Sequence, residues 1–203
     1  MSQTICLALT GASGLPYGLR LLECLLEAGC RVQLLYSQAA QVVARQELNF
    51  ELPSRPSEAR TALLARFPTV DGEKLSVYGR EEWFAPVASG SNPPDAMVVC
   101  PCSMGTLASI AQGLSDNLIE RAADVVLKEG RKLVLVPRET PFSAIHLENM
   151  LRLTRAGAVI LPPSPGFYHP PQSVQDIVDF VVARILDQLR VPHTLMQRWG
   201  DDR

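Results

Sequence analysis

Several features are scarce in this chain, and each scarcity excludes a class of protein. The formal net charge is only −2 at pH 7, so the chain has neither the basic field that nucleic acids require nor a polybasic patch for membranes. No apolar run approaches the roughly 18–20 residues that span a bilayer, and no charged segment precedes the first run, so we expect no membrane span and no signal peptide. The five cysteines are odd in number and several lie in apolar segments. They predict reduced, buried thiols in a cytoplasmic protein.

The usual dinucleotide and nucleotide motifs are also missing. An apolar run ends in the sequence LTGASG, where Gly11 is followed by Gly14 and then Gly18, so the spacing is not GxGxxG. No Walker Lys-Ser/Thr pair follows, and no tyrosine begins a Tyr-x-x-x-Lys pair. The second predicted strand, residues 32–36, leads into Ser37 instead of the acidic residue that holds an NAD ribose. The turn at Gly11 to Gly14 is either a tight connection or a binding site for a phosphate. We favour a phosphate-bearing ligand other than NAD.

What is present is a regular alternation of apolar runs and helical patterns. Near-continuous Val/Ile/Leu runs between helices indicate a parallel sheet covered on both faces. The sequence therefore predicts a Rossmann/flavodoxin-like α/β fold of three layers, with a mostly parallel sheet. We expect strands over 4–9, 32–36, 96–100, 133–136 and 158–161, and helices over 16–27, 39–46, 57–66, 105–112, 117–128, 143–155 and 173–189.

The 203 residues suffice for one such domain, which we place at 1–190. Residues 191–203 contain too little apolar material to fold alone, and we expect this tail to pack on its own or a neighbouring subunit. The proline-rich region 49–95 breaks the alternation. We interpret it as an elaborated connection with a short helix and room for a minor strand, and not as a second domain.

The strand predicted over 96–100 also leads into small hydroxyl residues, in the stretch Cys102-Ser103-Met104-Gly105-Thr106. Two such loops in one parallel sheet can flank a ligand at the carboxyl ends of the strands, although Ser103 also suits a simple helix cap. Cys100 and Cys102 are not spaced as Cys-x-x-Cys, and no histidine lies at ligand spacing, so we expect no metal.

Charged residues that follow buried segments are the remaining candidates. Arg138-Glu139 comes directly after a buried strand and is either a plain salt bridge or a phosphate-binding guanidinium beside a proton-handling carboxylate. Arg121 and Lys128 are two helical turns apart and share a face. Each also fits an ordinary solvated charge, as does Arg184.

Taken together, these segments resemble one family from end to end. The matching stretches, in order, are LTGASG, Ser37 with Ala39-Ala40, ASGS at 88–91, CPCSMGTL, NLIERAADVVLKE, LVLVPRETPFS, GAVILPPSPGFYHPPQS and the closing Arg198-Trp199. The chain resembles the UbiX-type flavin prenyltransferases, homo-oligomeric flavoproteins of a flavodoxin/Rossmann-like fold. Leu15-Pro16 and Gln38 depart from the family pattern, and neither removes an expected ligand.

The resemblance implies a reaction and a set of partners. The family joins a dimethylallyl group from dimethylallyl phosphate to N5 and C6 of reduced FMN, without a metal. The prenylated FMN serves a UbiD-type decarboxylase in ubiquinone biosynthesis or aromatic-acid metabolism. It also implies a homo-oligomer, with a dodecamer expected, whose sites draw residues from more than one subunit.

The resemblance also implies the site residues. It places FMN against Gly11, Ala12, Ser13, Ser37, Ser103, Met104, Gly105, Thr106 and Arg138. It places the prenyl phosphate against Trp83, Ser89, Arg121, Lys128, Arg138, Glu139, Tyr168 and Arg184. The residues it implies in catalysis are Ser13, Glu47, Glu139, Tyr168 and Trp199.

The residue types suit this chemistry. The departing phosphate gains charge that Arg121, Lys128, Arg138 and Arg184 can stabilise in place of a metal, and the Asp-rich DDxxD motif of diphosphate-dependent enzymes is absent. Glu139 or Tyr168 can supply a proton to the phosphate. The tryptophans Trp83 and Trp199 offer π-electrons to an allylic cation, and the family match gives Ser13 and Glu47 the proton lost on ring closure.

Two rival functions remain at this point. An FMN-dependent cysteine decarboxylase of the phosphopantothenoylcysteine type shares the fold, but requires a histidine after the first helix and an Asn-Met-rich loop. The nearest histidine is His146, far along the chain. A non-catalytic FMN-binding module would not require Glu139 beside Arg138.

Overall fold

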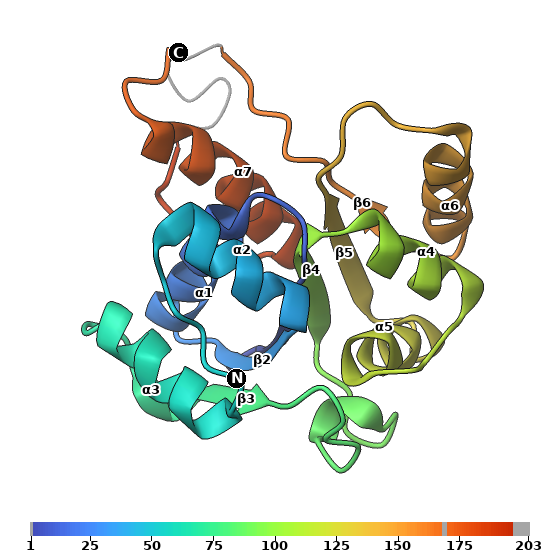
Figure 1. The fold of residues 1–203 in the computed structure, drawn as a ribbon, viewed down its shortest axis with the longest axis horizontal. Coiled ribbons are helices and arrows are strands. Elements are labelled where there is room, and N and C mark those ends of the chain that lie inside the picture. Colours follow the sequence, from blue (N-terminus) through green and yellow to red (C-terminus); the bar gives the residue numbers. More distant parts are fainter. Residues whose placement is uncertain (1, 168–169, 197–203) are drawn as a thin grey trace.

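A single parallel sheet organises the molecule. The computed structural model describes residues 2–167 and 170–196. Its six strands lie in the order β3-β2-β1-β4-β5-β6, and every pair of neighbours is parallel (Figure 1). The strands are β1 Thr4–Leu9, β2 Arg31–Tyr36, β3 Leu75–Tyr78, β4 Ala96–Cys102, β5 Lys132–Pro137 and β6 Val159–Ile160.

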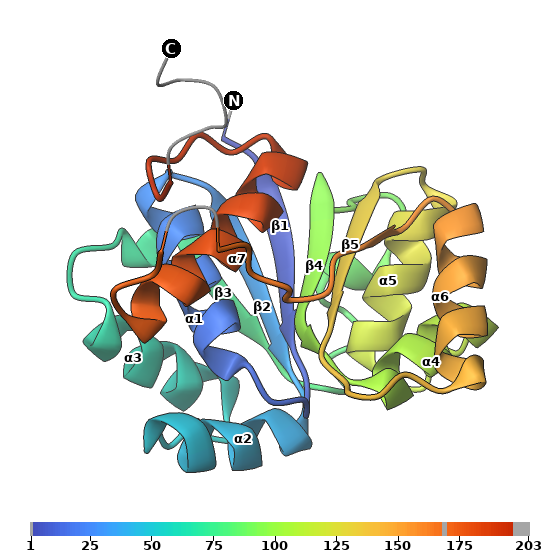
Figure 2. The same ribbon diagram turned by 90° about the horizontal axis from the view of Figure 1, so that it is seen from above.

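The described residues form seven α-helices, most of which cover the two faces of this sheet, while α2 packs on α1 beyond the ends of the strands (Figures 1 and 2). Helices α1 and α7 pack on one face, and their leucines and valines form one core with alternate side chains of the strands. Helices α4, α5 and α6 build a second core on the other face. The helices are α1 Leu15–Glu27, α2 Gln38–Leu48, α3 Pro56–Arg66, α4 Met104–Gln112, α5 Leu118–Lys128, α6 Ala144–Arg155 and α7 Val174–Leu189.

The central strands show why the apolar runs were informative. Residues Ile5 to Leu9 are completely buried, because helices cover both sides of β1 while β2 and β4 pair with its two edges. The expected three-layer α/β architecture is confirmed, and each expected strand and helix is present with ends shifted by at most two residues.

The region 49–95 contains the expected helix, α3, and an additional edge strand, β3. This strand of four residues pairs with β2 and carries only one fully buried side chain, Leu75. Two 3-10 turns, η1 Gly72–Lys74 and η2 Pro86–Ala88, complete the connection. A short edge strand of mixed polarity has no clear period, so sequence alone indicated only that a strand would fit there.

The structure also locates the cysteines and the start of the C-terminal tail. All five cysteines are buried and unpaired. In the tail, Val191 is buried and Leu195 packs against the core formed by α1 and α7. No helix in the described part of the chain is long and apolar enough to cross a membrane.

One close contact between α1 and β4 yields a test of this packing. A Cβ atom on Gly18 would lie 2.3 Å from the backbone oxygen of Cys100 and 2.6 Å from Cδ2 of Leu9. Because backbone cannot easily yield, we expect Gly18→Ala to lower the free energy of unfolding by about 1–3 kcal/mol in urea titrations. The matched control is Gly105→Ala, in the first turn of α4, where an added Cβ meets nothing within 4 Å. Equal stability of the two variants would contradict this account.

Candidate functional site

Four loops meet at the carboxyl edge of the sheet, where the strands that precede them end. The backbone N–H of Ser37, after β2, donates to the Leu9 carbonyl at 3.0 Å. The N–H of Ser103, after β4, donates to the Thr10 hydroxyl at 2.8 Å. The N–H of Arg138, after β5, donates to the Cys102 carbonyl at 3.3 Å. These bonds bring the predicted FMN-binding loops together in one chain.

Two of these loops end in hydroxyl caps. Ser37 accepts a hydrogen bond from the N–H of Ala40 at 3.1 Å and so caps α2. Ser103 accepts from the N–H of Thr106 at 3.3 Å and so caps α4, and its hydroxyl also lies 3.0 Å from that of Thr106. Since the amino ends of both helices lie at the same edge, their positive dipole ends and hydroxyls suit a phosphate.

The turn between β1 and α1 binds a carboxylate of the chain itself, and not the ligand phosphate that the sequence predicted there. The carboxylate of Glu47, on α2, accepts hydrogen bonds from the N–H groups of Gly14 at 3.0 and 3.1 Å and of Leu15 at 2.9 Å. An internal anion therefore occupies the amino end of α1, where the Gly-rich turn was expected to receive a phosphate. A ligand phosphate fits better at the amino ends of α2 and α4. The same contacts place the Glu47 carboxylate at Gly14, the residue that follows Ser13.

Small residues form this edge of the sheet. A Cβ on Gly11 would lie only 2.3 Å from that of Ala39, so the turn after β1 approaches α2 as closely as backbone allows. Ala12 is buried, whereas Ser13 and Gly105 are exposed. Small residues, hydroxyl donors and two serine-capped helix starts together fit the ring and phosphate of a flavin.

Two buried cysteines, Cys100 and Cys102, lie next to this edge. Burial raises the pKa of Cys102 to about 12 and also raises the pKa of Cys100, which disfavours the thiolate form of both. No group of three or more His, Cys, Asp or Glu side chains is placed to hold a metal ion within residues 2–167 and 170–196.

Arg138 and Glu139 lie at the same edge, after β5. Arg138 is exposed and, within the described residues, pairs with no carboxylate, so the salt-bridge interpretation of this dipeptide is wrong. Glu139 is half-buried and accepts a hydrogen bond from the N–H of Thr140 at 3.1 Å. Both charges are therefore available to a ligand.

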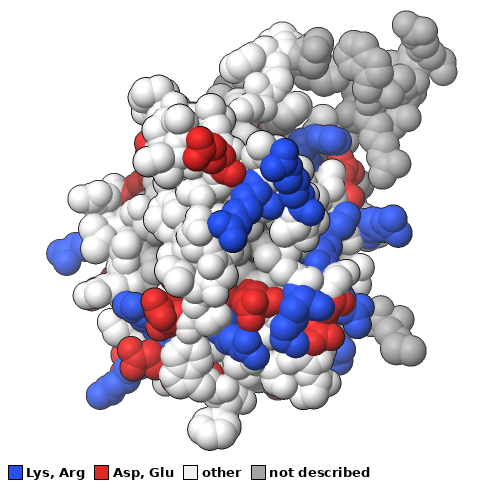
Figure 3. Space-filling model, turned by 90° about the vertical axis from the view of Figure 1, so that its right-hand side faces the viewer, with Lys and Arg blue, Asp and Glu red and all other residues white. Residues whose placement is uncertain are grey.

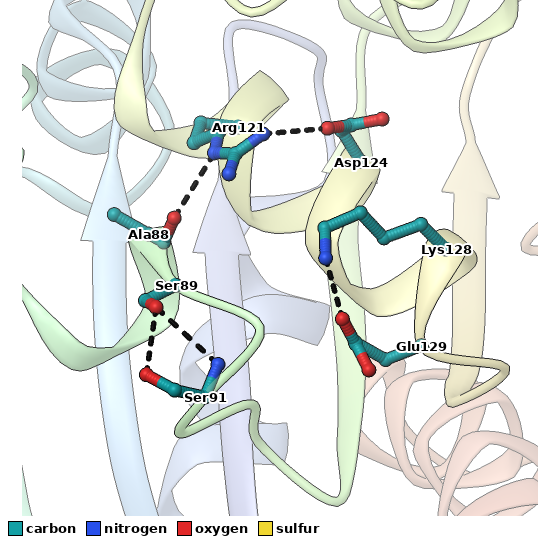
Figure 4. Close-up of polar contacts among 7 residues, drawn as sticks. All are labelled: Ala88, Ser89, Ser91, Arg121, Asp124, Lys128 and Glu129. Atoms are coloured by element: carbon teal, nitrogen blue, oxygen red, sulfur yellow. Dashed lines mark hydrogen bonds and ion pairs between the residues drawn. The ribbon is translucent and has the colours of Figure 1, made fainter.

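A second group of predicted residues surrounds the start of α5 and the loop before β4 (Figure 4). Arg121 donates from Nε to the Ala88 carbonyl at 3.0 Å and from Nη1 to Asp124 at 2.8 Å. The hydroxyl of Ser89 lies 2.8 Å from that of Ser91. Arg121 and Lys128 share one face of α5, as their spacing predicted, and that face is turned to this loop.

Lys128 pairs with Glu129, the next residue (Figure 4). Gly90 makes this arrangement possible, because a Cβ there would lie 2.1 Å from Oε1 of Glu129 and 2.5 Å from Nζ of Lys128. The two cations of this cluster are thus matched by two carboxylates, Asp124 and Glu129. Neither carboxylate was singled out by sequence, since acidic residues on an exposed helix face carry no signal of their own.

Lys128 and the loop of Ser89 lie toward the opposite edge of the sheet. Lys128 ends α5 four residues before β5 begins, and Ser89 to Ser91 precede β4. In a parallel sheet, these positions lie at the amino ends of the strands. Ser89 and Lys128 are therefore separated from the loops at the carboxyl edge of the same chain. Arg121 lies in the first turn of α5, where the N–H of Leu118 donates at 2.8 Å to the carbonyl of Arg80, which follows β3.

Arg184 lies apart from both groups of residues, on α7 beside β6. Its guanidinium donates to Asp187 at 2.7 Å, and the other oxygen of Asp187 lies 3.2 Å from Nε2 of His193. Arg184 also lines a cavity along β6 with Leu161 and Phe180. Trp83 is about half exposed in the loop before η2. Tyr168 and Trp199 lie outside the described residues.

Comparison with known proteins supplies the remaining evidence. Residues 1–186 match the model of the flavoprotein family. The chain is 57% identical over 199 residues to the flavin prenyltransferase UbiX of Pseudomonas aeruginosa, covering 98% of this chain and 95% of that protein.

Two solved structures agree in fold and sequence. The crystal structure of AnUbiX (PadA1) in complex with FMN and dimethylallyl pyrophosphate superposes with a TM-score of 0.87 at 42% identity and covers 98% of both chains. The structure described as a dodecameric FMN-dependent UbiX-like decarboxylase from Escherichia coli O157:H7 gives 0.85 at 43% identity, covering 97% of this chain and 99% of that one. With a like fold, the same order of motifs and this identity over nearly its whole length, the chain belongs to the flavoprotein family and, within it, to the UbiX flavin prenyltransferases.

Proposed function

We propose that this chain transfers the dimethylallyl group of dimethylallyl phosphate to reduced FMN. The C–O bond of the ester breaks, phosphate leaves, and C1 of the prenyl group bonds to N5 of the flavin, which loses its proton. The prenyl double bond then takes up a proton at C2, and its C3 bonds to C6, which loses the proton it carried. The observation that carries this proposal is the 57% identity to a flavin prenyltransferase over almost the full length. The carboxyl edge of the sheet, with its small residues and two capped helix starts, supports the proposal because it suits a flavin phosphate.

The residues at the carboxyl edge would bind and orient the flavin. Hydroxyls of Ser37, Ser103 and Thr106, at helix starts, suit its phosphate. Arg138, which has no carboxylate partner among the described residues, can pair with an anion bidentately. The carboxylate of Glu47 is held by the backbone N–H groups of Gly14 and Leu15, which follow Ser13 in the chain. Glu47 and Ser13 would handle a proton at the edge of the flavin ring.

The prenyl phosphate would be bound by cations from separate parts of the assembly. Lys128 and Arg184 lie away from the carboxyl edge of their own chain, so they would reach a flavin bound by another copy, and Arg121, on the same face of α5 as Lys128, would join them. The family resemblance implied shared sites of this kind. A dodecameric neighbour supports a homo-oligomer, and we propose a dodecamer for this chain.

The surface over α6 also supports association between copies. Phe142, Ile145, Leu147 and Leu151 are 38–68% exposed on or next to this helix. Figure 3 shows the side of the molecule on which α4, α5 and α6 lie, where basic and acidic side chains are interspersed with broad uncharged areas. Exposed apolar side chains gathered in one region are typical of protein interfaces.

We further propose that prenylated FMN is passed to a UbiD-type decarboxylase, in ubiquinone biosynthesis or aromatic-acid metabolism, and that the chain works in the cytoplasm. The free, buried cysteines support a reducing compartment. The identity of the UbiD-type recipient rests on the family resemblance alone.

The direct test is anaerobic incubation of the purified protein with reduced FMN and dimethylallyl phosphate. Mass spectrometry should detect a flavin heavier by one prenyl unit, and inorganic phosphate should appear in equal amount. A parallel incubation with dimethylallyl pyrophosphate tests the diphosphate ester that the solved neighbour binds. Absence of prenylated flavin with both donors would refute the proposal.

Glu139 should be needed for turnover but not for flavin binding. Its carboxylate is half-buried beside Arg138 and can protonate the departing phosphate, a role typically worth about 10²–10⁴-fold. We expect Glu139→Gln to bind FMN normally and to lose turnover by about that factor. Glu148→Gln, an exposed carboxamide exchange on α6, is the matched control. Normal turnover by Glu139→Gln would show that this carboxylate does not handle the proton.

Glu129 should compete with the donor phosphate for Lys128. Glu129→Gln removes the competing charge while keeping the shape of the side chain, so inorganic phosphate should bind about two- to fivefold more tightly, in the range of an exposed ion pair. Isothermal titration with phosphate measures this change. Glu58→Gln is the matched control, because Glu58 forms a similar exposed pair with Arg55 at 3.1 Å. Unchanged or weaker phosphate binding by Glu129→Gln would contradict the competition.

A further inference from the structure

Thr10 is a buried polar residue that the proposed chemistry does not use. It follows the last residue of β1 and is only 1% exposed, one of few buried polar side chains in the described chain. It lies in the LTGASG stretch, between the apolar β1 and the Gly-rich turn, but it is not among the predicted site residues. Burying a hydroxyl is unfavourable unless it is hydrogen-bonded, so its contacts show what it does.

The Thr10 hydroxyl bridges two loops. It donates to the Pro101 carbonyl at 2.8 Å and accepts from the N–H of Ser103 at 2.8 Å. The backbone N–H of Thr10 also donates to the Pro101 carbonyl, at 3.2 Å. The paired register of β1 and β4 ends at Ala8 and Val99, so these bonds continue the connection beyond the end of the ladder.

The bond to Ser103 fixes the residue that caps α4. The Ser103 hydroxyl contacts both the backbone N–H and the hydroxyl of Thr106, and these groups belong to the predicted flavin-binding set. On the other side, Thr10 directly precedes Gly11, Ala12 and Ser13. One buried hydroxyl thus links the loop after β1 to the loop after β4.

We propose that Thr10 is a positioning residue, whose hydroxyl sets the spacing of the two loops that bind FMN. This inference rests on the proposed flavin function and adds a residue outside the predicted site. A valine side chain has nearly the same shape, but it would leave the Ser103 N–H without its partner. A buried N–H without a hydrogen-bond partner destabilises the arrangement of the two loops, and this free energy would be lost from the binding of FMN.

The test compares four variants with the wild-type chain in FMN binding. Thr10→Val removes the hydroxyl at constant shape, while Thr10→Ser and Thr10→Ala both lack the methyl group and differ only in the hydroxyl. Thr154→Val is the matched control, since that hydroxyl bonds only to the Met150 carbonyl within α6, at 2.9 Å. Fluorescence quenching gives the Kd of FMN, the absorption spectrum reports the flavin environment, and circular dichroism reports folding.

We expect Thr10→Val and Thr10→Ala to weaken FMN binding about tenfold and to alter the flavin spectrum, as the loss of a buried hydrogen bond implies. Thr10→Ser should bind within about threefold of the wild type, and Thr154→Val should be unchanged. At saturating FMN, the KM for dimethylallyl phosphate should change less than the Kd of FMN.

Three outcomes would overturn the inference. Thr10→Val could bind FMN as tightly as the wild type, or Thr10→Ser could bind as weakly as Thr10→Ala. If neither Val nor Ala folds while Ser does, the hydroxyl is a requirement of the fold and not a positioning group. Failure of the proposed function is distinguishable, because the wild-type chain itself would then bind no FMN and form no prenylated flavin.

Discussion

The hydrogen-bonded ladder of β1 with β2 and β4 is the constraint on which the rest depends. It runs in one parallel register from Thr4 to Leu9 on the β2 side and from Ile5 to Ala8 on the β4 side. Parallel pairing brings the carboxyl ends of neighbouring strands to the same edge, so loops distant in sequence meet there. Because helices cover both faces of the sheet, water is kept from the ladder, and the side chains of Ile5 to Leu9 are completely buried.

The ladder also separates charges. Arg138 and Glu139 follow a strand, whereas Lys128 precedes one, so a single chain presents them at opposite edges. Lys128, Arg121 and Arg184 each lie against an acidic residue one or three positions further along the chain. Those carboxylates limit the net charge that the isolated cations present, so anion affinity depends on which partners the charges find in the assembly.

The parts of the fold that sequence predicted are those with a strong local pattern. Long apolar runs became the central strands, and Ser37, Ser103 and Asn117 cap helices where their side chains can accept the first free N–H groups. Edge strand β3 was only loosely anticipated, because four residues of mixed polarity without a clear period cannot be told from a loop. The contacts of Glu47 and Thr10 could not be predicted, since the bonded groups lie 32 or more residues apart in sequence.

The sequence by itself determined the fold class, the family and the kinds of side chain at the strand ends, because local periodicity and ordered motifs survive without coordinates. Only the tertiary structure decided which anion lies at the start of α1, which carboxylates accompany the cations, and which predicted residues share an edge. These outcomes depend on strand order and helix direction. A linear pattern does not contain them, because through-space distance is set by packing across the whole sheet.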